Sequence, residues 1–128
     1  MPDRLNISTN APWEDIVGYS RAVKTGNIIE VSGTAPVQAG KTSFPGNAYE
    51  QTKVCIKIIE DSLSQAGASL KNVIRTRMFV TDISRWEEYG KAHGEYFGKI
   101  KPATSMVEVK SLISPDMLIE IEATAVID

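Results

Sequence analysis

The sequence predicts one α+β domain, a sandwich in which two helices pack on one face of a mixed β-sheet. Two stretches, residues 48–66 and 84–97, repeat apolar residues at the three- and four-residue steps of a helix. Shorter stretches around them alternate as strands do, so the expected order of elements is ββαβαββ. The chain of 128 residues fits a single domain, residues 1–128, which can bury a core without a metal or a disulfide.

The first third of the chain predicts an irregular lead-in, a β-hairpin and a loop. Residues 1–15 show a mixed pattern with two prolines, so no regular element is expected there. Extended runs at residues 19–23 and 27–32 are separated by a short segment ending in Gly26, which supplies the positive φ that a tight turn often needs. Residues 37–46 contain two glycines and a proline and are expected to form a loop.

The first helix is predicted over residues 48–66. Asn47 can cap its N-terminus, and Gly67 follows its last residue, where a left-handed cap is common. Cys55 lies on the inner face of this helix, so we expect a buried, unreactive thiol. The residues of that face are Ala48, Thr52, Cys55, Ile56, Ile59, Leu63 and Ala66.

A capping box of Ser84 and Glu87 is predicted to open the second helix, and Pro102 blocks any continuation of it. His93 is the only histidine in the chain. Its position on an apolar stripe favours a packing role over a catalytic one. The stripe consists of Trp86, Tyr89, His93, Tyr96 and Phe97.

Residues 73–82 alternate as a strand with two different faces. Thr76, Met78 and Val80 share one face, whereas Arg75, Arg77, Phe79 and Thr81 share the other. A face that combines arginines with a phenylalanine suits water only in part, so an oligomer that covers it is expected. Two further alternating runs, at residues 101–109 and 119–125, complete the sheet.

The glutamates of the last strands are candidate partners for those arginines. If the arginine face is covered, Arg75 and Arg77 need carboxylates, and Glu108, Glu120 and Glu122 are in place to supply them. The result is either a structural ion-pair network or an anion-binding pocket; solvated arginines are the third alternative. Glu120 and Glu122 also share a face, and their repulsion is expected to raise one pKa towards the range of general acid–base catalysis.

Composition and motifs exclude several classes of function. The net charge of −2 attracts neither nucleic acid nor anionic lipid, and no apolar run is long enough to span a membrane. A single cysteine and an N-terminus unlike a signal peptide indicate a cytoplasmic protein. Nucleotide-binding glycine motifs and zinc motifs are missing, and one histidine cannot build a histidine-rich metal site, so neither a cofactor nor a metal is expected.

Five segments resemble, in order and spacing, those of the Rid family (reactive intermediate deaminases, also called YjgF). They are residues 17–23, 27–34, 66–73 and 78–82, and a C-terminal signature made of residues 101–109 and 119–125. The resemblance implies the chorismate-mutase-like fold and a homotrimer whose sheets pack into a central barrel. It also implies three clefts between subunits, each lined by two chains and each holding a small-molecule substrate.

The resemblance also implies a reaction and its residues. Deaminating members of the family bind a 2-imino or enamine acid, water adds to the imine carbon, and ammonia leaves. Glu120 matches the glutamate that orients the water or moves protons. Tyr19, Ser32 and Gly33 match residues that line the substrate cleft.

The chain departs from the family pattern at the carboxylate-binding position. Thr104 stands where the family has an arginine that holds the substrate carboxylate in a two-pronged contact, which threonine cannot copy. Ser105 and Met106 follow it in the substrate-binding segment, and Met106 replaces a common cysteine. Gly90 replaces a helix asparagine. Loss of the charged contact is expected to weaken turnover of a carboxylate substrate roughly 30- to 1,000-fold.

These observations leave three hypotheses for the function of the chain. The first is imine or enamine hydrolysis on an altered, less acidic substrate, or with Arg77, Arg21 or Lys101 as a replacement cation. The second is a non-catalytic trimer that binds a small metabolite or has a regulatory role. The third is a ribonuclease or translation inhibitor, as some relatives are labelled; the acidic composition speaks against it.

Overall fold

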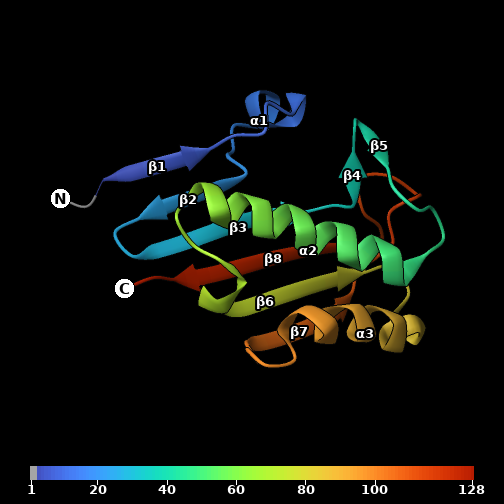
Figure 1. Ribbon diagram of the computed structural model, residues 1–128. Coiled ribbons are helices and arrows are strands. Elements are labelled where there is room, and N and C mark those ends of the chain that lie inside the picture. Colours follow the sequence, from blue (N-terminus) through green and yellow to red (C-terminus); the bar gives the residue numbers. More distant parts are fainter. Residues whose placement is uncertain (1–2) are drawn as a thin grey trace.

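Six strands form one mixed sheet, and the two long helices lie side by side on one of its faces in the computed structural model, which describes residues 3–128 (Figure 1). The strand order is β1-β2-β3-β8-β6-β7, antiparallel except for the parallel pair β6–β7 at one edge. The predicted α+β class is confirmed. The elements are β1 Arg4–Ile7, α1 Pro12–Val17, β2 Ala22–Thr25, β3 Ile28–Thr34, β4 Val37–Gln38, β5 Lys41–Thr42, α2 Ala48–Gln65, β6 Val73–Val80, α3 Trp86–Phe97, β7 Ala103–Glu108 and β8 Ile119–Val126, with short 3₁₀ turns at Leu70–Asn72 and Ile83–Arg85.

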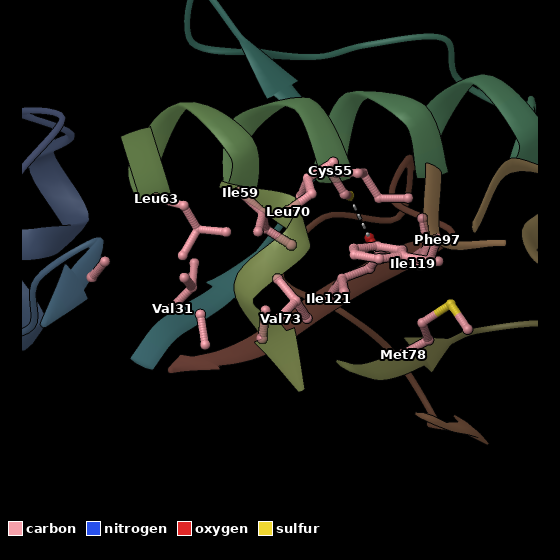
Figure 2. Close-up of a cluster of buried hydrophobic side chains, with 14 of the residues drawn as sticks. Val31, Cys55, Ile59, Leu63, Leu70, Val73, Met78, Phe97, Ile119 and Ile121 are labelled. Carbon is pink, nitrogen blue, oxygen red and sulfur yellow. Dashed lines mark hydrogen bonds between the residues drawn. The ribbon is translucent and has the colours of Figure 1, made fainter. Parts of the chain in front are cut away.

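Helix α2 follows the prediction closely. The Asn47 side chain accepts a hydrogen bond from the Glu50 amide at 2.9 Å, which satisfies one free donor of the first turn. Gly67 adopts φ +81° just beyond the helix, a conformation that a side chain would strain. Cys55 is fully buried, its Sγ lies 3.9 Å from the Ile119 carbonyl oxygen, and burial raises the pKa of the thiol (Figure 2). The expected unreactive thiol is therefore supported.

The start of α3 differs from the prediction. The Asp82 side chain accepts from both the amide and the hydroxyl of Ser84, which begins a 3₁₀ turn two residues early and takes Ser84 out of the predicted capping box. The helix therefore starts at Trp86 without a side-chain cap. Trp86 is 56% exposed and does not belong to the buried stripe, whereas Tyr89 and Phe97 do.

The expectation of an irregular lead-in over residues 1–15 was wrong for residues 4–7 and 12–15 and holds for residues 8–11, while residues 1–2 lie outside the described part of the chain. β1 pairs with β2, and α1 starts with Pro12, where a missing N–H leaves no helical hydrogen bond unmade. Glu14 is buried and accepts hydrogen bonds from the Ser8 hydroxyl and from the amide and hydroxyl of Thr9. These bonds fasten α1 to the end of β1. The predicted loop at residues 37–46 likewise contains the two-residue strands β4 and β5.

One face of the sheet is covered by the helices and the other is open. The core packs between the sheet and α2 and α3 (Figure 2). Along β8 the odd-numbered residues 119–125 are buried, so Glu120, Glu122 and Thr124 point to the open face, whereas Leu118, just before the strand, packs against the core. Along β6, Thr76, Met78 and Val80 are buried and Arg75, Arg77 and Phe79 are not, as predicted.

Candidate functional site

The predicted site residues divide into two groups on opposite faces of the sheet. Glu120 alternates with the buried Ile119 and Ile121 and therefore belongs to the open face. Thr104 pairs in parallel register with Thr76, which is fully buried beneath the helices, so Thr104 belongs to the helix face at the edge of the sheet. One chain alone does not bring Glu120 and Thr104 into one cavity.

Glu120 lies directly against the backbone of Gly33. A Cβ placed on Gly33 would come within 2.5 Å of Glu120 Oε2, so position 33 must lack a side chain for the carboxylate to lie there. Arg21 donates from Nη2 to the Gly33 carbonyl oxygen, which places its guanidinium beside the same backbone segment. Three residues predicted for the site, Glu120, Gly33 and Arg21, are thus brought together by the pairing of β2, β3 and β8.

The surroundings of Glu120 change its acidity. Burial raises the pKa of the Glu120 carboxyl above its ordinary value; the positive charge of Arg21 opposes this, and the negative charge of Glu122 adds to it. The repulsion from Glu122 expected from the sequence is therefore the smaller cause, after burial. A carboxyl whose pKa is raised by burial and opposed by a nearby cation is a candidate for accepting and returning a proton.

Tyr19 and Ser32 lie near this carboxylate but line a separate, open depression. The guanidinium carbon of Arg21 is 5.9 Å from the centroid of the Tyr19 ring, which connects the two places. The Ser32 hydroxyl donates to the Ser20 carbonyl oxygen at 2.6 Å. The depression is lined by Arg4, Asn6, Glu14, Asp15, Gly18, Tyr19, Ser20, Val23 and Ser32.

The second group is a line of hydrogen bonds that ends at Thr104. His93 Nε2 lies 2.9 Å from Thr76 Oγ1, which lies 2.8 Å from Thr104 Oγ1. His93 also packs on Phe97, with ring centroids 4.6 Å apart, so the predicted packing role is confirmed. Burial lowers the pKa of His93 below its ordinary value. The bonds to Thr76 were missed from the sequence, because the one from His93 depends on how α3 packs over β6 and the one to Thr104 on the parallel register of β6 and β7.

Ser105 and Met106 point in different directions from each other. The Ser105 hydroxyl accepts from Arg75 Nη2 at 2.8 Å. Met106 is half-buried and packs against the hydrophobic core. The segment that follows Thr104 therefore contributes to both faces of the sheet, as alternation requires.

The three candidates for a replacement cation lie in different places. Arg21 is beside Glu120, and Arg77 Nη1 is 3.9 Å from Glu122 Oε1 on the open face. Lys101 occupies an exposed, left-handed position (φ +54°) just before β7. Of the three, only Lys101 precedes Thr104 on the same edge segment.

The predicted carboxylate partners are only partly found. Glu122 pairs loosely with Arg77, while Glu108 instead accepts from the Ile83 amide at 3.0 Å.

Within residues 3–128, no cluster of three or more His, Cys, Asp or Glu side chains is placed to hold a metal ion. In the same part of the chain, no helix combines the length and the apolar character needed to cross a membrane.

Comparison with known proteins identifies several similar chains. The model of the endoribonuclease L-PSP family matches residues 8–127. A RutC family protein of Pyrococcus abyssi is 40% identical over 120 residues, covering 93% of this chain and 94% of the relative. The 3-aminoacrylate deaminase RutC of Acinetobacter baylyi is 33% identical over 126 residues, covering 98% of each. The crystal structure of a Mycobacterium tuberculosis member of the YjgF/YER057c/UK114 family is similar with a TM-score of 0.90 at 47% identity, covering 98% of this chain and 100% of that chain.

Proposed function

This chain belongs to the endoribonuclease L-PSP family, also called the YjgF or Rid family, and from that premise we propose that it hydrolyses a reactive imine or enamine that carries no carboxylate. The reaction consumes one water and gives a carbonyl compound and ammonia. A relative at 33% identity is a 3-aminoacrylate deaminase, which supports an enamine or imine as the substrate class.

The observation that carries the proposal is the placement of Glu120 against Gly33 and beside Arg21. In its ionised form the carboxylate takes a proton from water as the oxygen attacks the imine carbon. In its protonated form it returns that proton to the nitrogen, which gives a carbinolamine. The hydroxyl proton of the carbinolamine then reaches the nitrogen by the same route as the carbon–nitrogen bond breaks, so a carbonyl compound and ammonia leave. The charge of Arg21 favours the ionised form that starts the cycle, and burial favours the protonated form that completes it.

The division of the site between two sheet faces supports a homotrimer with clefts between subunits. Glu120 and Thr104 belong to opposite faces of one sheet, so only another copy of the chain can bring the two together in one cleft. The edge strand β7 leaves Thr104 exposed, and the open face presents Phe79 with charged neighbours, a surface that a second sheet can cover.

The charges around the two groups support an uncharged substrate end. Arg21 donates to the Gly33 carbonyl oxygen and its charge acts on Glu120, and Arg77 lies beside Glu122. Arg21 and Arg77 both lie near the glutamates of the open face, whereas the arginine of other family members would stand at position 104. A carboxylate in the cleft would therefore meet a hydroxyl where other members offer a two-pronged cation.

The test is the rate of imine hydrolysis with two kinds of substrate. An amine oxidase generates an uncharged imine in place, and an amino-acid oxidase generates a 2-imino acid. We expect the protein to accelerate the first, Thr104→Arg to shift the preference to the second, and Glu120→Gln to abolish both. If the unmodified protein accelerates neither imine, or if Glu120→Gln retains full activity, the proposed function is wrong.

A second candidate is a trimer that binds a metabolite without turning it over. The loss of the arginine at Thr104 and of the common cysteine at Met106 favours it. Thermal stabilisation by a carbonyl compound, without acceleration of imine hydrolysis, would identify this role. Cleavage of RNA, which the family's name suggests, is not proposed, because a net charge of −2 provides no attraction to a polyanion.

A further inference from the structure

The line of hydrogen bonds behind Thr104 has a direction that decides what its hydroxyl offers to a ligand. Thr76 is fully buried and connects His93 Nε2, at 2.9 Å, to Thr104 Oγ1, at 2.8 Å. Thr104 Oγ1 also lies 3.2 Å from the Pro102 carbonyl oxygen, which can only accept. Each threonine hydroxyl has one proton to donate, so all three contacts are hydrogen bonds together in one arrangement only. A second arrangement arises when Thr104 gives up its bond to Pro102.

In the first arrangement the line runs outward. His93 Nε2–H donates to Thr76, Thr76 donates to Thr104, and the Thr104 proton points to Pro102 at a long 3.2 Å. A ligand acceptor at normal distance can replace that contact. In the second arrangement Thr104 donates to Thr76 and Thr76 donates to an unprotonated Nε2. The lone pairs of Thr104 are then free to accept from a ligand N–H.

We propose that His93 and Thr76 are positioning residues that hold the Thr104 hydroxyl as an uncharged recognition group, and that it binds an uncharged polar end of the substrate such as a primary amide. This inference rests on the proposed function, because a substrate reaches Thr104 only if the cleft includes it. An amide presents both an acceptor and a donor, so it fits either direction of the line. A carboxylate can only accept, and it would gain one neutral contact in place of a charged pair.

The burial of the line makes it more than a surface contact. A fully buried hydroxyl at Thr76 must find its partners within the protein, so it constrains both neighbours. His93 is fixed in turn by its ring contact with Phe97. The exposed Thr104 side chain is therefore oriented from behind, although its own strand lies at the edge of the sheet.

The experiment uses the single histidine as a reporter. The full chain is labelled with ¹⁵N-histidine, so all imidazole signals belong to His93. Pyruvamide, an uncharged carbonyl amide, and pyruvate, its carboxylate counterpart, are titrated while the Nε2 signal is followed. The variants are Thr76→Val, which keeps the shape but removes the relay, Thr76→Ser, which restores a hydroxyl, and Thr104→Val with Thr104→Ser as its matched control.

We expect pyruvamide to shift the His93 Nε2 signal in the unmodified protein and in both serine variants, and not in either valine variant. Thr76→Val should weaken pyruvamide binding about 5- to 10-fold although Thr76 is too buried to touch the ligand, and combining it with Thr104→Val should add little. His93→Phe, which keeps the ring packing, should weaken binding as Thr76→Val does, and His93→Gln should recover part of it.

Two results overturn the inference. One is tighter binding of pyruvate than of pyruvamide. If Lys101→Met then abolished the preference for pyruvate, the neighbouring lysine would be its cause. The other is a His93 signal that neither ligand moves. In the second case the imine assay separates the explanations: persisting hydrolysis leaves the proposed function intact and removes only the role of the line, while a lack of hydrolysis removes both.

Discussion

The two halves of the candidate site are built from opposite kinds of chemistry. On the open face, Glu120 is a partly buried carboxylate that lies against the Gly33 backbone and within the electrostatic influence of Arg21. At the edge strand, Thr104 is an uncharged hydroxyl joined through Thr76 to a histidine whose pKa is lowered by burial. The first half is suited to moving protons, and the second to recognising a neutral group. Under the proposed function, catalysis and recognition therefore lie in separate halves, and each half is open to change alone.

The largest effect is expected from removing the proton-moving half. Glu120→Gln preserves size but cannot take a proton from water, so the rate of imine hydrolysis should fall about 100- to 10,000-fold. Rates measured with an uncharged imine, together with circular dichroism to confirm the fold, check this. Binding of pyruvamide should survive, because recognition lies in the other half; loss of both would break the separation.

Changing the recognition half should alter preference more than maximal rate. Thr104→Arg supplies a charged donor, so the ratio of 2-imino acid to uncharged imine hydrolysis should rise by roughly 30- to 1,000-fold. The ratio of kcat/KM for the two substrates is the measurement. Thr104→Ser is the matched control and should leave the ratio near that of the unmodified protein. An unchanged ratio in Thr104→Arg would place Thr104 outside the cleft.

A methyl group at Gly33 should disturb the proton-moving half through geometry alone. The new Cβ would lie 2.5 Å from Glu120 Oε2, and the flexible carboxylate end can move away, so activity should drop about 10-fold or more with little loss of stability. Gly94→Ala is the control, since its Cβ meets nothing within 4 Å on α3 and should stabilise by about 0.5–1 kcal/mol. Equal activity in Gly33→Ala would contradict the close placement of Glu120.

The smallest expected effect concerns pH and stability. The pKa of Glu120 is raised in the folded chain, so the native state binds more protons than the unfolded state between the two pKa values. Stability from this group is therefore present below the ordinary value of 4.5 and is lost as pH rises through the folded pKa. Denaturant unfolding at several pH values should show Glu120→Gln gaining stability relative to the unmodified protein as pH rises. A relative loss over that range would have the wrong sign.

The two long helices and the central strands were predictable because each follows from local periodicity, whereas β1, α1, β4 and β5 were not predicted. The alternation along residues 119–125 placed Glu120 and Glu122 on one face, and the steps of three and four residues gave α2 almost to its ends. Pro12 misled the prediction, because proline at the start of a helix resembles proline in a loop. Ser84 misled it because the Asp82 side chain accepts from the Ser84 amide, which the predicted capping box assigned to the Glu87 side chain.

The site was predictable only where the chemistry lay within one strand or matched the family's pattern. The contact between Gly33 and Glu120 depends on the pairing of β3 with β8, and the link from His93 to Thr104 depends on the parallel register of β6 and β7. Spacing along the chain carries neither register. The division of the site between two faces was likewise hidden, because it follows from where β7 joins the sheet.

The central claim, that Glu120 and Thr104 meet only between chains, is tested most directly by mixing two inactive variants. Glu120→Gln and Thr104→Trp, which blocks the recognition half, are unfolded together at equal concentration, refolded and assayed with an uncharged imine. Random assembly gives each cleft an intact glutamate and an intact threonine in about one case in four, so roughly a quarter of the unmodified activity should return. If the mixture stays as inactive as its two components, the halves do not complement each other and the site lies within one chain.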